Sequence, residues 1–72
     1  MKTLLIMRHA KSDWGAAFEA DHDRPLARRG EKAARRIGRF LSETGVAPEL
    51  ILSSTALRAH STAVLADDAG GW

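Results

Sequence analysis

The chain has 72 residues, enough for one small domain, and domains of this size bury only about 60% of their unfolded surface. It contains no cysteine, which excludes disulfides and thiolate metal sites as sources of stability. The 11 Lys and Arg exceed the 9 Asp and Glu, and an arginine-rich balance suits partners that carry phosphate or carboxylate groups. A complete α/β enzyme is normally longer, so we expect residues 1–72 to be part of a larger domain.

The first apolar run, residues 3–7, is short and is followed by polar residues and a glycine-containing segment. We interpret it as a strand buried on both faces, as in a parallel sheet. It is too short for a signal-peptide core, and no segment approaches the length of a membrane span. The sequence therefore predicts a cytoplasmic protein with no membrane partner.

Residues 10–25 are rich in charged and turn-forming side chains, and Pro25 disfavours helix at Arg24. We predict a long loop here. Loops of this length in small domains are usually functional.

Residues 26–44 are predicted to form a helix, which Gly45 would end at its C-terminus. Gly30 inside this helix costs about 1 kcal/mol relative to alanine, which a close packing contact would explain. The apolar stripe consists of Ala33, Ala34, Ile37, Phe40 and Leu41.

A second short apolar run, residues 50–52, is followed by the candidate helix caps Ser53, Ser54 and Thr55. A second helix is predicted from Thr55 to about Asp67, with a frayed tail after it. The order is strand, loop, helix, strand, helix. It predicts an α/β fold with two parallel strands joined by a right-handed crossover.

Ligands of open parallel sheets bind beyond the carboxyl ends of the strands. The first predicted strand ends in Arg8 and His9, and Arg58 lies one turn beyond the end of the second. Parallel strands would bring these three side chains to one edge. Helix N-termini favour anions, so an arginine in a first helical turn is better explained if a phosphate shares the site.

These residues also have simpler interpretations. An Arg-His pair arises by chance about 0.3 times in a chain of this composition, and a lone helix arginine is usually just exposed. His22 is interpreted as a solvated loop residue, and His60 as pointing to a different helix face from Arg58. No two histidines have the spacing of a metal site, so we expect no metal.

The arginines of the first predicted helix could form a basic face, and nucleic-acid binding is one functional hypothesis that follows from it. The four aromatic residues are not interleaved with basic ones, so we expect no nucleic-acid partner. The arginines concerned are Arg28, Arg29, Arg35, Arg36 and Arg39.

Three segments, "LLIMRHAKSDW", "DHDRPLARRGEKAARRIGRFL" and "LILSSTALRAHSTA", together resemble the N-terminal half of the histidine phosphatase superfamily, and among its branches the SixA-type phosphohistidine phosphatases. Arg8-His9-Ala10 stands where the family has its Arg-His-Gly signature, and the segment Ser53 to Thr62 resembles the second signature. The resemblance implies a three-layer α/β/α, phosphoglycerate-mutase-like fold. Residues 1–72 would be its N-terminal, parallel-sheet βαβα portion.

The resemblance also implies roles. His9 would take the phosphoryl group of a phosphohistidine on a protein, or of a small phosphorylated substrate, and water would then hydrolyse the phosphohistidine formed. Arg8 and Arg58 would clamp the phosphoryl oxygens and supply the positive charge, so no metal or cofactor is expected. Lys11 and Ser12, in the loop that follows, are additional candidates for phosphate binding.

Members of this family carry a second catalytic histidine and further strands in a C-terminal half, beyond the point that corresponds to Trp72. Neither His22 nor His60 matches that second histidine by motif, and nothing assigns a general acid, although Asp21 and Asp23 lie in a suitable loop. We expect a truncated domain, or one completed by another chain in an oligomer. The alternative function is a non-catalytic fragment that binds phosphate or a phosphoprotein.

Overall fold

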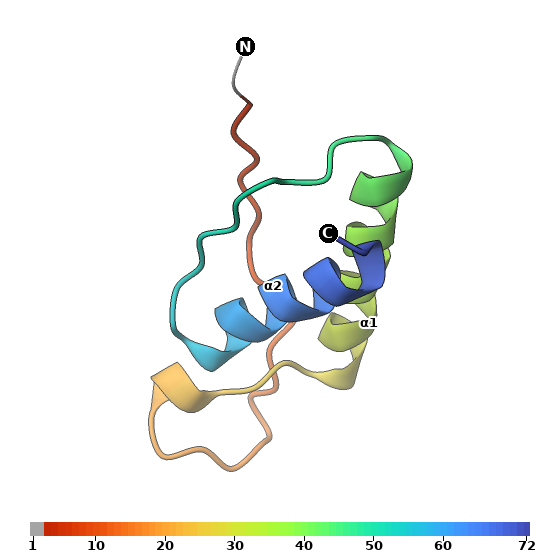
Figure 1. The fold of residues 1–72 in the computed structure, drawn as a ribbon. Helices are drawn as coiled ribbons and strands as arrows, with labels where there is room; N and C mark the ends of the chain where they lie inside the picture. The colour runs from red at the N-terminus through yellow and green to blue at the C-terminus, as the bar shows by residue number, and fades with distance from the viewer. Residues whose placement is uncertain (1–2) are drawn as a thin grey trace.

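The computed structural model describes residues 3–72. Its regular elements are the short 3₁₀ helix η1 (Asp21–Asp23) and two α-helices, α1 (Arg28–Glu43) and α2 (Leu57–Gly70). In Figure 1 the two α-helices cross and pack on each other, and two extended segments run beside them. Both helices were predicted from the sequence, with starts two residues earlier than observed.

The end of α1 follows the prediction for Gly45. Its φ of 76° lies in the left-handed region, where a side chain is disfavoured. The Gly45 N–H donates to the Ser42 carbonyl (3.2 Å) and the Val46 N–H to the Leu41 carbonyl (3.0 Å). These two bonds form a Schellman motif, which satisfies carbonyls that the end of a helix leaves free.

Small residues let α1 and α2 approach closely. A Cβ on Gly38 would lie 2.7 Å from the Ala66 Cα, and Ala66 is fully buried. The predicted apolar stripe is therefore correct at Ala34, which is 2% exposed, but Ile37 and Phe40 are 40% and 56% exposed. The buried residues of α1 are Gly30, Ala34 and Gly38, and of these Gly38 lies directly against Ala66 of α2.

The predicted parallel sheet is wrong for residues 3–72, which contain no strand and only one isolated bridge, between Ser12 and Leu26. The two apolar runs are extended but do not pair, and a cavity lies between them. A strand needs a partner about 4.8 Å away for its backbone N–H and C=O groups, and an isolated two-stranded pair is marginal at best. Leu4, Ile6, Leu50 and Leu52 are instead 76–87% exposed.

The loop of residues 10–25 is fixed at its base against the start of α1. The Asp13 N–H donates to the Pro25 carbonyl and the Ala27 N–H to the Lys11 carbonyl, both at 2.8 Å. The close contact expected at Gly30 is present, because a Cβ there would lie 2.9 Å from the Lys11 backbone nitrogen. Gly30 thus allows the loop to pass directly over α1.

The ends of α2 differ from the prediction. No side chain caps its N-terminus, but the Ser54 hydroxyl accepts a hydrogen bond from the Ala56 N–H (3.1 Å) just before the first turn. At the other end the predicted frayed tail is wrong. Gly71 has a φ of 69°, and the Trp72 N–H donates to the Asp67 carbonyl (3.1 Å), which turns Trp72 back toward the helix.

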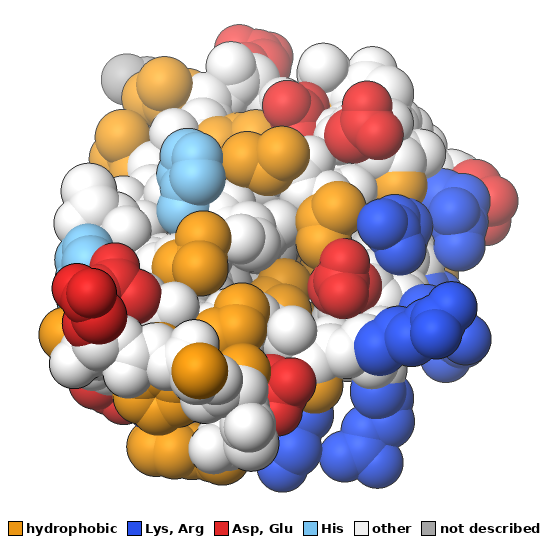
Figure 2. Space-filling view, turned by 90° about the horizontal axis from the view of Figure 1, so that it is seen from below, with side chains coloured by type: hydrophobic (Ala, Val, Ile, Leu, Met, Phe, Trp, Pro, Cys, Tyr) orange, Lys and Arg blue, Asp and Glu red, His pale blue; other side chains and the backbone are white. Residues whose placement is uncertain are grey.

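The surface carries an uneven charge distribution. On the face that Figure 2 shows, Lys and Arg side chains gather on one side, over α1, and the visible His side chains lie on the opposite side. Among the described residues, neither helix is both long and apolar enough to cross a membrane. The exposed basic residues of α1 are Arg28, Arg29, Lys32, Arg35, Arg36 and Arg39.

Candidate active site

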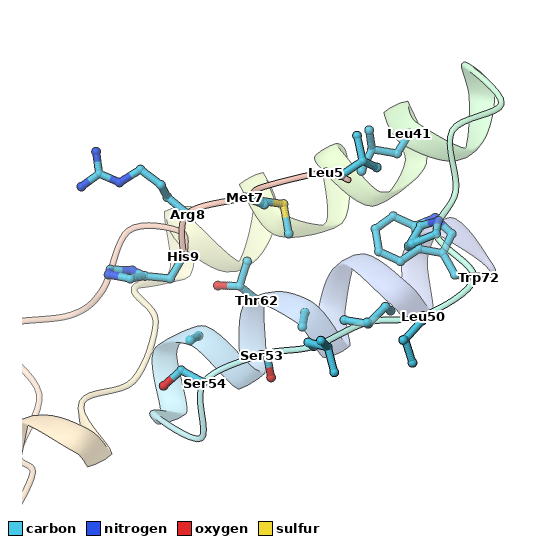
Figure 3. A pocket seen from close by; sticks show the side chains of 15 residues that line it. Leu5, Met7, Arg8, His9, Leu41, Leu50, Ser53, Ser54, Thr62 and Trp72 are labelled. Carbon is cyan, nitrogen blue, oxygen red and sulfur yellow. The ribbon is translucent and has the colours of Figure 1, made fainter. Parts of the chain in front are cut away.

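A cavity of about 460 Å³ lies between the two extended segments and one face of α2. Figure 3 shows its apolar end, formed by Leu5, Leu41 and Trp72, and its polar end, where Arg8 and His9 lie. Polar side chains from the second segment and from α2, namely Ser53, Ser54 and Thr62, complete the lining toward this polar end. The cavity extends along the two apolar runs, and one end of it reaches the polar residues that follow them. That these residues bind a ligand stays a prediction.

His9 is exposed, and its ring orientation is defined by one contact. The Nδ1 atom lies 2.8 Å from the carbonyl oxygen of Ala10. Since a carbonyl can only accept a hydrogen bond, Nδ1 carries the proton, and in the neutral imidazole Nε2 keeps its lone pair. Nε2 is therefore the nitrogen able to act as a nucleophile. Arg8 directly precedes His9 in the chain.

Thr62 ties the segment after His9 to the first turns of α2. Its hydroxyl oxygen accepts a hydrogen bond from the Ala10 N–H (3.1 Å) and its O–H donates to the Arg58 carbonyl (2.7 Å). Thr62 is 4% exposed, and both bonds are partly shielded from water. The main chain at Arg58 is thus two hydrogen bonds away from the residue that follows His9.

The guanidinium of Arg58 faces the loop of residues 10–25. Its Nη1 donates to the Asp21 carbonyl (2.7 Å), and its Nη2 lies 3.0 Å from the Asp21 Oδ2. Arg8 and His9 line the cavity described above, whereas Arg58 does not. Thr62 therefore links the residue after His9 to the main chain of Arg58, but the Arg58 side chain is paired with Asp21, and a shared phosphate site for Arg8, His9 and Arg58 stays a prediction.

The two other predicted phosphate-binding residues belong to the base of the loop. Ser12 is 7% exposed, and its hydroxyl accepts a hydrogen bond from Arg24 Nε (3.1 Å). The Lys11 side chain is exposed, while its carbonyl accepts the bond from Ala27 described above. Phosphate binding by either residue stays a prediction.

Arg24 is a buried cation that no motif in the sequence indicated. It is 5% exposed, its Cζ lies 3.4 Å from the centroid of the Trp14 ring, and it forms an ion pair with Asp21. Stacking on an indole and pairing with a carboxylate compensate a buried guanidinium. The sequence signal for this ion pair is the three-residue spacing of Asp21 and Arg24, which brings the two side chains together only if residues 21–23 form a helical turn.

The remaining histidines lie elsewhere. The His22 Nε2 is 3.4 Å from the Thr55 hydroxyl, and His60 lines a separate cavity with Leu26 and Leu57. Among residues 3–72, no three His, Cys, Asp or Glu side chains form a group suited to a metal ion.

Comparison with known proteins identifies the family of this chain. The family model of the histidine phosphatase superfamily (branch 1) matches residues 4–71, and the chain belongs to this superfamily. The crystal structure of a protein assigned as the phosphohistidine phosphatase SixA from Agrobacterium tumefaciens superposes with a TM-score of 0.81 at 38% identity, over 90% of this chain and 42% of that one. The resemblance stated from the sequence, including its SixA-like character, is confirmed.

Two curated relatives extend the comparison. A 2,3-bisphosphoglycerate-dependent phosphoglycerate mutase of Thermobifida fusca is 40% identical over 99% of this chain. An uncharacterized chloroplastic protein of Arabidopsis thaliana is 44% identical over 85% of it. The chain spans 30% and 28% of the lengths of these relatives.

Proposed function

We propose that this chain carries the phosphoryl-accepting part of a phosphatase, with His9 as the nucleophile. The observation that supports this most directly is the contact between His9 Nδ1 and the Ala10 carbonyl, because in the neutral imidazole it assigns the lone pair to Nε2. An imidazole can attack phosphorus only through such a nitrogen. Membership of the histidine phosphatase superfamily agrees with phosphatase-type chemistry.

The reaction proceeds in two transfers. The Nε2 lone pair of His9 forms a bond to phosphorus while the bond from phosphorus to the leaving group breaks and that group keeps the electron pair. Water then attacks the same phosphorus, the N–P bond breaks, its electron pair returns to Nε2, and a water proton is released. Guanidinium groups, for which Arg8 and Arg58 are the candidates, stabilise the charge on the phosphoryl oxygens in both steps.

The proposed substrates are a phosphohistidine on a protein or a small phosphorylated molecule. The SixA protein that this chain resembles is assigned as a phosphohistidine phosphatase, which favours the first. In phosphohistidine the leaving group is an imidazole, which leaves readily once protonated. A strong general acid supplied by the enzyme is therefore less necessary for this substrate than for a phosphate ester of an alcohol.

The test is to incubate the protein with phosphoramidate and to locate acid-labile phosphate by mass spectrometry. We expect label on His9, no label in His9→Ala, and unchanged label in the matched controls His22→Ala and His60→Ala. Label on another residue, or label that persists in His9→Ala, would refute the proposal.

A second candidate function is phosphate or phosphoprotein binding without turnover. One observation favours it: within the described residues, His22 contacts Thr55 and His60 lines a separate cavity, so neither joins His9 in the cavity that His9 lines. In this case inorganic phosphate binds but a phosphohistidine substrate is not hydrolysed. Measured turnover by this chain would rule it out.

A further inference from the structure

Six residues are joined by polar contacts that, together with the backbone from Ala10 to Ser12, form a ring at the start of the loop, and we call this the polar ring. From Ala10 it passes through Thr62 to the Arg58 main chain, as described above. From the Arg58 guanidinium it returns through Asp21 and Arg24 to Ser12, two residues after Ala10. The members of the polar ring are Ala10, Ser12, Asp21, Arg24, Arg58 and Thr62.

Asp21 is the residue of the polar ring that joins two guanidiniums. Its Oδ1 pairs with Arg24 and its Oδ2 with Arg58, while its carbonyl accepts a second bond from Arg58. The Asp21 side chain is 59% exposed, and an exposed ion pair alone holds a side chain weakly. Here Arg58 is held at two points, and Arg24, which is buried, fixes the carboxylate from the other side.

These contacts use one edge of the Arg58 guanidinium and leave the other edge without a hydrogen-bond partner among the described residues. Asp21 engages Nη1 and Nη2, and within residues 3–72 the Nε–H of Arg58 donates no hydrogen bond. A guanidinium has five N–H donors in a rigid fork, so the edge formed by Nε–H and one Nη–H is able to take two oxygens of a phosphoryl group.

We infer that Asp21 is a positioning residue that holds Arg58 by its Nη atoms, so that the Nε edge of Arg58 is presented to the phosphoryl group. This inference rests on the proposed function and assigns a role to the long loop. The loop places Asp21 between the buried Arg24 and the first turn of α2, so that one carboxylate contacts the guanidiniums of both Arg24 and Arg58.

Asp23 provides a matched control, because it lies in the same 3₁₀ turn and carries the same charge. It is exposed, and its side chain forms no ion pair or hydrogen bond within the described part of the chain. Removing either carboxylate reduces the local negative charge, which by itself would favour phosphate. Only the loss of Asp21 also frees the Arg58 side chain.

The experiment is an NMR titration with inorganic phosphate at constant ionic strength. We expect Asp21→Asn to raise the Kd for phosphate about fivefold, and Asp23→Asn to change it less than twofold. In an Arg58→Lys background, which lacks the fork, Asp21→Asn should cause no further loss. Equal effects of the two Asp→Asn variants, or full additivity with Arg58→Lys, would overturn the inference.

A measurement on the unsubstituted chain covers the case in which Asp21→Asn disturbs the loop. If Asp21 holds Arg58, the Nη protons of Arg58 give separate, slowly exchanging NMR signals without any ligand. A single averaged signal contradicts the inference. If phosphate fails to bind and His9 is not labelled, the proposed function fails, and the Nη signals still show whether Asp21 holds Arg58.

Discussion

Gly38 lies at a point of close approach between α1 and α2, and the substitution Gly38→Ala tests whether this packing controls stability. Alanine in place of glycine inside a helix is favourable by about 1 kcal/mol. Against this, the added Cβ would lie 2.7 Å from both the Ala66 Cα and the Ala66 carbonyl carbon. These are backbone atoms of a helix, so the clash is relieved only by moving the helices apart.

Overpacking of this kind costs about 1–3 kcal/mol, and a clash with backbone belongs at the upper end of that range. The net expectation is a loss of about 2 kcal/mol in the free energy of unfolding. For a domain of this size that corresponds to a decrease of roughly 10 °C in Tm.

The assay is thermal and urea unfolding followed by circular dichroism. The control is Ala33→Gly at an exposed position of the same helix, which calibrates helix propensity alone and should cost about 1 kcal/mol. If Gly38→Ala unfolds at the same or a higher temperature than the unsubstituted chain, the close approach of the helices at Gly38 is refuted.

Three further substitutions test other contacts. Gly45→Ala, at a φ of 76°, should lower the free energy of unfolding by about 1 kcal/mol in the same assay, and Gly45→Asn by less. Thr62→Val leaves the Ala10 N–H without its acceptor, so we expect a loss of about 2 kcal/mol and faster hydrogen exchange at that amide, whereas Thr62→Ser should retain both bonds. Trp14→Leu removes the ring that lies over Arg24 and should cost about 0.5–1 kcal/mol in urea unfolding, and an unchanged midpoint would show that the stacking contributes nothing.

The helices could be predicted because their signals are local. The spacing of apolar residues and the position of Gly45 define α1 within its own sequence, and the penalty at Gly30 correctly indicated a close contact. Ile37 and Phe40 show the limit of such a pattern, because it marks an apolar face without saying what covers it. The face that is buried runs through Gly30, Ala34 and Gly38, two of which contribute no side chain.

The predicted sheet failed because a strand depends on neighbours that a short apolar run does not specify. The candidate site could be predicted only in part, because it also depends on neighbours that are distant in the sequence. Arg8 and His9 line one cavity, whereas the partner of Arg58 is Asp21, a loop residue whose position depends on η1 and on the buried Arg24. Contacts between a loop and a helix 37 residues apart follow from the folded chain and not from residue spacing.

The two tryptophans of the chain give it a pair of intrinsic optical reporters. Trp14 lies over Arg24 in the loop, whereas Trp72 lines the cavity that Arg8 and His9 also line, with its indole N–H buried and unpaired within the described residues. Indole emission shifts with the polarity of its surroundings. In a Trp14→Phe variant, Trp72 would be the sole fluorophore. Its emission would then follow the entry of water or an anion into the cavity without any attached dye.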